Sequence, residues 1–197
     1  MKGVLFVLTI LNVKKGVRML IKDTPIIIRT AKISEIETVK NFLLQQCKLL
    51  YNGEISPNQC QDLEQSQAKY FLPERHTLIG AFLTTGQLVG TIAVSVYNDR
   101  ISCIKGRYAP HTAAEIGRCY ISPELRRSGI GSQLFNSALD FALSANYKFL
   151  YLHTHKFLPG GFNFWLKNGF KITVDEEDIH QTVHMELDLA AFIGDKI

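Results

Sequence analysis

The sequence predicts an α/β fold, more closely an α+β arrangement in which a mixed sheet is flanked by helices. Apolar residues make up 46% of the 197 residues and charged residues 20%, a composition typical of a globular core. Short β-rich runs also alternate with stretches of helical apolar spacing. The predicted element order, β-α-α-β-β-β-α-β-α-β-β, places helices on a single mixed sheet.

The first elements follow residue 25. A strand is expected over Ile26–Arg29, and a helix whose capping box is formed by Ser34 and Glu37 follows it. Its apolar residues recur at helical spacing: Ile36, Val39, Phe42, Leu43 and Leu50. Ser56 directly before Pro57 predicts the start of a second helix.

The middle of the chain predicts a hairpin and a third strand. Residues 76–98 contain two β-rich runs joined near Thr85–Gly86, which indicates the hairpin. The segment "AAEIGRCYIS" (113–122) predicts the next strand, and a helix is expected to begin near Gly129. One face of that helix is apolar: Ile130, Leu134, Ala138, Phe141 and Ala145.

The last elements complete the sheet. Residues 148–154 predict a strand, and Phe162–Lys167 a short helix that ends at Asn168 and Gly169. Glycine suits the left-handed position after a helix. The segments 170–174 and 182–189 predict the final pair of strands.

The expected organisation is one domain over residues 19–190, after an extension (1–18) and before a short tail (191–197). Residues 4–13 are apolar but shorter than a membrane-spanning helix. The segment "KKGVR" follows them where a secretory signal would need small residues, so secretion is not expected. Met19 is a plausible start of the domain.

Charge and cysteine content narrow the expected partners and location. A formal net charge of +4 is small for nucleic-acid binding, and no membrane partner is expected. It is compatible with an anionic small ligand at a local positive site. The four cysteines, which show no CxxC pairing, predict reduced thiols and a cytoplasmic location: Cys47, Cys60, Cys103 and Cys119.

The segment "RRSGIG" (126–131) predicts an anion site. It joins a strand that ends near Ile121 to the helix that begins near Gly129. Free backbone N–H groups and the helix dipole favour an anion there. Glycines at 129 and 131 leave room for a bulky phosphate to approach those amides, and Arg126 and Arg127 add positive charge.

Two familiar nucleotide motifs do not match this segment. A dinucleotide fingerprint would need a third glycine where Leu134 stands, and the lysine of a P-loop is absent. An ordinary turn, in which the glycines only permit tight packing, remains the alternative on spacing alone.

Four motifs in series resemble the GNAT superfamily of N-acetyltransferases. "RRSGIG" is similar to the family's Q/R-x-x-G-x-G/A motif, and "CYISPEL" to the strand and proline that precede it. "FWLKNGF" (164–170) resembles a late family motif, and "GQLVG" (86–90) a hairpin turn. The resemblance covers residues 24–188 and implies the acyl-CoA N-acyltransferase fold, with a central, mostly antiparallel sheet.

The resemblance also implies the reaction and the coenzyme site. The expected activity is direct transfer of an acetyl group, in a ternary complex, from acetyl-CoA or another acyl-CoA to a primary amine, without a metal. Tyr120 and Ile121 would bind the pantetheine arm. The pyrophosphate would lie against the segment that begins at Arg126, on the amides of Arg127, Ser128, Gly129, Ile130, Gly131 and Ser132.

The catalytic groups follow from what amine acylation requires. The amine must lose a proton, and Glu115 resembles the general base of the histone acetyltransferase branch; a structural ion pair is the alternative. The family commonly has a tyrosine where Trp165 stands, and an indole cannot protonate the departing thiolate. Either the thiolate leaves without a dedicated acid, or another group protonates it, and the candidates are Tyr151, His153 and His155. Arg118, three residues after Glu115, could recognise a substrate carboxylate.

Several alternatives stay open. The E-x-x-R spacing at Glu115 also resembles acyl-homoserine-lactone synthases, which suggests a longer-chain acyltransferase that uses acyl-CoA or acyl-carrier protein. A binding module without turnover is a third possibility. His153 and His155 share a strand face, but two ligands do not predict a zinc site.

The acceptor is expected to be a small-molecule or protein amine, and the chain a monomer or homodimer. The acidic run "DEEDIH" (175–180) is expected to border the acceptor, either attracting a cationic amine or forming a solvated turn.

Overall fold

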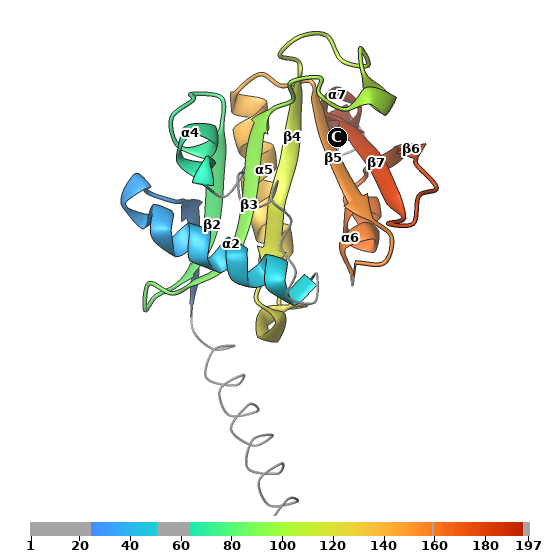
Figure 1. Ribbon diagram of the computed structural model, residues 1–197. Coiled ribbons are helices and arrows are strands. Elements are labelled where there is room, and N and C mark those ends of the chain that lie inside the picture. The colour runs from blue at the N-terminus through green and yellow to red at the C-terminus, as the bar shows by residue number, and fades with distance from the viewer. Residues whose placement is uncertain (1–24, 51–63, 159, 195–197) are drawn as a thin grey trace, which may run out of the picture.

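The structure is a computed structural model, and it describes residues 25–50, 64–158 and 160–194. Its sheet has seven strands in the order β1-β2-β3-β4-β5-β7-β6, and β4 and β5 form its parallel pair (Figure 1). This confirms the predicted mixed, mostly antiparallel sheet. The strands are β1 (Ile26–Thr30), β2 (Thr77–Leu83), β3 (Leu88–Val96), β4 (Ala113–Ile121), β5 (Phe149–His155), β6 (Lys171–Asp175) and β7 (Thr182–Asp188).

Helices cover both faces of the sheet. Helices α2 and α4 lie on the face nearer the viewer in Figure 1, and α5 lies behind β2, β3 and β4. The α-helices are α2 (Ile36–Leu50), α4 (Ser66–Tyr70), α5 (Ile130–Ser144), α6 (Gly161–Lys167) and α7 (Leu189–Gly194). The 3-10 turns are η1 (Ile33–Glu35), η2 (Ser102–Ile104) and η3 (Pro123–Leu125).

The core forms two layers because successive residues of a strand point to opposite faces. Leu78 and Phe82 of β2 join the cluster beneath α2, whereas Ile79 and Ala81 of the same strand join the cluster beneath α5. Every residue of β2 is therefore buried. Burying one large aliphatic or aromatic side chain contributes about 1.5–3 kcal/mol, so the two layers hold the central strands firmly in place.

The start of α2 differs from the prediction. The expected capping box of Ser34 and Glu37 is wrong: the turn η1 precedes the helix, and the Lys32 N–H donates to Glu35 Oε2 at 2.7 Å. Arg29 donates two further hydrogen bonds to the Glu35 carboxylate, at 2.8 and 2.7 Å. The same carboxylate thus caps the turn and ties it to β1.

The second helix start, the glycine after α6 and the C-terminal boundary of the domain have different outcomes. The predicted helix start at Ser56 and Pro57 lies outside the described residues. Gly169 has the predicted left-handed backbone, with a φ of 87°. Helix α7 was not predicted; it crosses the expected boundary between domain and tail, and its Phe192 packs against the main core.

Strands β4 and β5 separate along their length. They pair only where Ala113–Glu115 lie beside Phe149–Tyr151, and the ribbons diverge beyond this point (Figure 1). On its other edge β4 carries a bulge against β3, where Arg118 has a φ of 51°. The Thr91 hydroxyl donates to the Arg118 carbonyl at 2.7 Å and so holds the bulge. The parting of the strands opens the sheet at its centre.

No helix among residues 25–50, 64–158 and 160–194 is both long and apolar enough to span a bilayer.

Candidate active site

Two adjoining cavities, of about 600 and 620 Å³, occupy the region where β4 and β5 separate, and together they are called the cleft. The "charged side" is the smaller one, lined by Lys69, Arg100, Glu115, Arg118 and His153 among others. The "loop side" is lined by Arg126, Arg127, Gly129, Gly131 and Ser132 among others. The two cavities are joined by their shared wall: Leu50, Cys119, Tyr120, Leu158, Gly161 and Trp165.

The loop side presents the start of helix α5. Gly129 is the N-cap, with a φ of 88°, and its carbonyl accepts the first helical hydrogen bond from the Gln133 N–H at 3.1 Å. The N–H groups of the first helical turn therefore have no acceptor within the helix. Arg127 also has a positive φ, 65°. Successive N–H groups in such a turn form a concave site suited to an anion.

The structure brings most of the predicted coenzyme-binding residues to this cavity. Its lining includes Tyr120, Ile121, Arg126, Arg127, Gly129, Gly131 and Ser132. Ser128 and Ile130 do not line it: the Ser128 hydroxyl donates to the Leu125 carbonyl at 2.6 Å, and the Ile130 side chain is buried in the core. These two residues can contribute only backbone groups, as the prediction requires.

Space around the glycines fits a bulky anion. A Cβ atom built on Gly131 would meet only Phe164, at 3.5 and 3.7 Å, and one built on Gly129 would meet nothing within 4 Å. The backbone is therefore open to the cleft rather than packed against protein. This contradicts the alternative in which the glycines only permit tight packing.

The charged side contains an ion pair in which the carboxylate is buried and the arginine is exposed. Glu115 is 8% exposed, and both of its carboxylate oxygens accept hydrogen bonds of 2.6 Å from Arg100. The expected alternative of a structural ion pair is therefore present in the cleft itself. Arg100 was missed from the sequence because it lies in the loop after β3, fifteen residues before Glu115, and no motif links the two.

His153 lies next to this pair. Its Nδ1 is 3.7 Å from Glu115 Oε1. Although the side chain of His153 is 43% exposed, its partial desolvation in the cleft lowers its pKa; Glu115 opposes this effect, and Arg100 adds to it. Because the pKa falls below the usual value of about 6.5, the imidazole is neutral at neutral pH. The structure thus brings together Glu115 and His153, two of the three predicted catalytic residues.

Tyr151, the third, is not brought to the cleft. Its side chain is completely buried, and its hydroxyl is 2.7 Å from His184 Nδ1. Burial raises the pKa of Tyr151, and nearby Glu115 adds to this effect. The residue lines neither cavity. Sequence spacing placed it on the correct strand, but its hydroxyl is already bonded within the protein.

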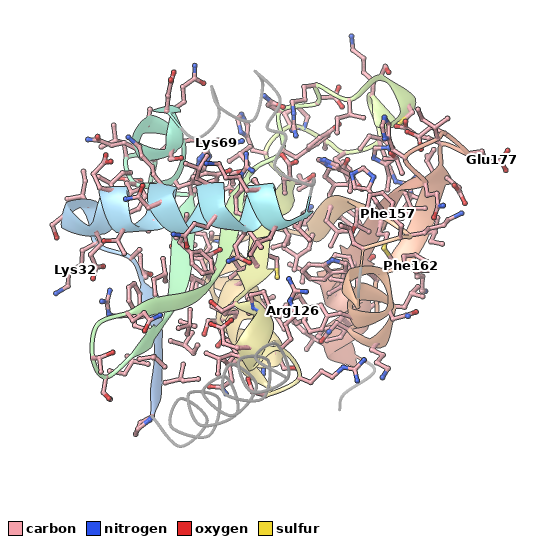
Figure 2. The ribbon with its side chains drawn as sticks, turned by 60° about the horizontal axis from the view of Figure 1, so that its bottom comes forward. Lys32, Lys69, Arg126, Phe157, Phe162 and Glu177 are labelled. Atoms are coloured by element: carbon pink, nitrogen blue, oxygen red, sulfur yellow. The ribbon has the colours of Figure 1, made fainter. Side chains whose placement is uncertain are left out.

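Two other sequence expectations concern metal and charge. His153 and His155 line the cleft, but neither belongs to the group of potential ligands that the described residues contain, which is Cys103, Glu176 and His184. The acidic run 175–180 does not line the charged side. Glu177 points away from the body of the molecule in Figure 2.

Trp165 and Cys119 complete the shared wall. Trp165 is 6% exposed and packs edge-on against Phe135, Phe164 and Phe170, as expected for a packing residue. Burial raises the pKa of Cys119 to about 12. Its thiol is therefore protonated at neutral pH, and a protonated thiol is a poor nucleophile.

Comparisons with known proteins agree with this geometry. The model of the acetyltransferase (GNAT) family matches residues 43–170, more than half of the chain. No functionally curated protein matches the sequence significantly.

Solved structures show the same fold. A GNAT-family acetyltransferase from Staphylococcus aureus Mu50 has a TM-score of 0.68 at 19% identity, covering 84% of this chain and 99% of its own. A PaiA N-acetyltransferase from Thermoplasma acidophilum, in complex with coenzyme A, has a TM-score of 0.58 at 23% identity, covering 83% of this chain and 99% of its own. Mutant forms of a spermidine/spermine N-acetyltransferase from Vibrio cholerae have a TM-score of 0.58 at 19% identity, covering 88% of this chain and 100% of their own.

Proposed function

The chain belongs to the acetyltransferase (GNAT) family and is an acyltransferase, and on this premise we propose that it transfers an acetyl group from acetyl-CoA to a primary amine. Attack by the amine would be direct, in a ternary complex. One observation carries the proposal: the backbone donors at the start of α5 open into one cavity, and Glu115 and His153 line the adjoining cavity, which shares six lining residues with the first.

The loop side fits coenzyme A. The N–H groups of Ile130, Gly131 and Ser132, together with the positive end of α5, suit a pyrophosphate. Arg126 and Arg127 contribute positive charge at the same cavity. At the end of β4, Tyr120 lines both cavities and Ile121 lines the loop side. The backbone of a splayed strand would bond the pantetheine arm there. The acyl group would then point towards the charged side.

We assign the proton transfer to His153, with Glu115 as its neighbour. Both carboxylate oxygens of Glu115 already accept hydrogen bonds from Arg100, which stabilise the ionised carboxylate. The neutral imidazole of His153 accepts the proton that the amine loses as its nitrogen bonds to the acetyl carbon. The same proton is then available to the coenzyme thiolate as the carbon–sulfur bond breaks. This gives the thiolate an acid although Tyr151 is enclosed.

The acceptor is proposed to be a small amine. One structural neighbour is named as acting on spermidine and spermine, which supports an amine without identifying it. Cys119 supports direct transfer, because a thiol with a pKa near 12 would not form an acetyl-enzyme readily at neutral pH.

Steady-state kinetics would test this proposal. Thiol release from acetyl-CoA is measured with a panel of primary amines, and the acetylated product is identified by mass spectrometry. We expect amine-dependent release, one product per thiol, and no acetyl-enzyme when the amine is omitted. A trapped acetyl-enzyme would overturn the direct mechanism. Greater turnover with octanoyl-CoA or an acyl-carrier protein would favour the longer-chain alternative, and tight coenzyme binding without turnover the binding module.

A further inference from the structure

Three side chains of the kinds that bind transition metals meet outside the cleft. Cys103 lies on the turn η2, Glu176 directly follows β6, and His184 lies on β7. Cys103 Sγ is 3.3 Å from His184 Nε2 and 3.5 Å from Glu176 Oε1. The same nitrogen and carboxylate oxygen are 2.7 Å apart. One thiol, one imidazole and one carboxylate therefore converge on a single point.

The size of this triangle suits a tetrahedral metal site. Zinc binds sulfur at about 2.3 Å and nitrogen or oxygen at about 2.0–2.2 Å, so tetrahedral ligand atoms lie roughly 3.4–3.6 Å apart. Both distances from Cys103 Sγ are already close to this range. Only His184 Nε2 and Glu176 Oε1 must move apart, as the metal replaces their hydrogen bond. The Glu176 side chain is 36% exposed and has room for this small shift.

The His184 ring is held in place from behind. Its side chain is 2% exposed, and its Nδ1 is 2.7 Å from the hydroxyl of the enclosed Tyr151. Histidines that bind a metal usually bond their other ring nitrogen to a neighbouring group, which fixes the orientation of the ring. With a metal on Nε2, Nδ1 carries the proton and donates to the Tyr151 oxygen, since a hydroxyl can accept as well as donate. Tyr151 is thus a positioning residue for His184.

The other two residues combine a fixed backbone with an exposed side chain. The Glu176 N–H donates to the Thr182 carbonyl at 3.0 Å. The buried side chain of Ile104 anchors the turn that carries Cys103. Cys103 and Glu176 are themselves exposed, so a metal can enter from solvent. A new metal site requires both a suitable ligand set and such an entry path.

We propose that Cys103, Glu176 and His184 bind a divalent transition metal, with Zn²⁺ as the best match. A thiolate and an imidazole suit zinc, whereas Mg²⁺ and Ca²⁺ prefer oxygen ligands. One thiolate and one carboxylate balance the charge of the ion, and the thiol proton passes to solvent as the metal–sulfur bond forms. Three protein ligands leave the fourth position to water.

This site goes beyond the proposed acetyl transfer. None of its three ligands lines either cavity of the cleft. The metal would instead fasten the loop after β3 to β7 and to the segment after β6. That loop also carries Arg100, which holds Glu115 in the cleft. We therefore expect the metal to stabilise the fold and to take no part in the chemistry.

Metal titrations of the full chain test the proposal. The protein is treated with a chelator, and Zn²⁺ binding is then measured by calorimetry. Co²⁺ serves as a spectroscopic probe, because a cobalt–thiolate bond absorbs in the near ultraviolet and a tetrahedral cobalt ion absorbs in the visible. We expect one equivalent per chain, both absorption features, and a Tm that rises with Zn²⁺ concentration.

Variants assign the binding to the three residues. Cys103→Ser and Glu176→Gln each remove a ligand at an exposed position and should weaken Zn²⁺ binding by roughly a hundredfold or more, whereas Tyr151→Phe should weaken it by roughly ten- to a hundredfold. The cobalt–thiolate absorption should disappear in Cys103→Ser and persist in Tyr151→Phe. Glu177→Gln is the matched control: Glu177 is adjacent to Glu176 but points away from the molecule (Figure 2), so affinity should equal that of the wild type.

Three outcomes would contradict the proposal. Failure of the folded wild type to bind Zn²⁺ would mean that the three side chains form only a hydrogen-bonded cluster. Equal affinity and an unchanged cobalt–thiolate absorption in Cys103→Ser would place the metal elsewhere. Loss of acetyl transfer from a metal-stripped protein that remains folded would show that the metal takes part in the reaction, against the position of its ligands outside the cleft.

Discussion

The two sides of the cleft are built in different ways. The loop side draws on one continuous segment, from the end of β4 to the first turn of α5, and offers mainly backbone N–H groups. The charged side is assembled from α4, the loop after β3, β4 and β5, and depends on side chains. Backbone donors persist through side-chain changes, whereas a side-chain site changes with single substitutions. One fold can therefore keep a coenzyme and exchange acceptors.

The largest expected effect is on the loop side. Gly131→Glu places a carboxylate where the pyrophosphate would lie, and its Cβ has room beside Phe164. We expect the protein to fold and acetyl-CoA affinity to fall at least roughly a thousandfold, through steric exclusion and like charge. Calorimetric titration measures the affinity, and thermal unfolding confirms the fold. Near-normal affinity would mean that this loop does not bind the coenzyme.

The charged side is tested next by His153→Asn. Removing a general base lowers kcat by roughly a hundredfold or more. In the wild type the neutral imidazole is the active form, so kcat should rise with pH and level off. The midpoint should lie below the usual histidine pKa of about 6.5, because burial lowers the pKa of His153. This acidic limb should disappear in the variant.

His111→Asn is the control for this substitution. His111 is exposed, away from the cleft lining, and has a φ of 61° that asparagine tolerates. Its kinetics should equal those of the wild type. A His153→Asn variant that kept both its rate and the acidic limb would move the base to another residue, Glu115 first.

Arg100→Met should have a smaller effect than the two preceding substitutions, and this effect should appear in the free energy of unfolding. It leaves the Glu115 carboxylate buried without its partner, which costs about 1–3 kcal/mol in the free energy of unfolding. Glu115→Gln in the same protein should recover part of this loss, because a neutral amide needs no counterion. Urea denaturation of the single and double variants measures both values. Equal stabilities would show that the pair contributes to positioning alone.

The smallest effect is expected at the shared wall. Cys119→Ala should change kcat by less than about threefold, which is below 1 kcal/mol in the activation free energy. The reason is that a thiol whose pKa is raised to about 12 stays protonated at neutral pH and is a poor nucleophile. A large loss of turnover, with an acetyl-enzyme in the wild type that is absent from the variant, would replace direct transfer by a covalent route.

The sequence predicted the loop side far better than the charged side. Glycines 129 and 131 indicate a local requirement of the backbone, so a single segment pointed to the anion site, although spacing alone left an ordinary turn open. Glu115 and His153 were found because they lie on strands whose positions the motifs indicate. Arg100 and Lys69 were missed, since the fold alone brings their elements to the cleft. Two other predictions from spacing were wrong. Tyr151 does not reach the cleft, because its hydroxyl is hydrogen-bonded to His184. Ser34 does not cap α2, because a 3-10 turn precedes that helix.

The division of the cleft into a coenzyme side and an acceptor side is tested most directly by titrating acetyl-CoA into the Lys69→Glu/Arg118→Asn double variant beside the wild type. We predict saturable binding to both, with dissociation constants that agree within about threefold, because neither cation lies at the pyrophosphate site. A loss of affinity as large as that of Gly131→Glu would show that these cations hold the coenzyme, and would contradict the account.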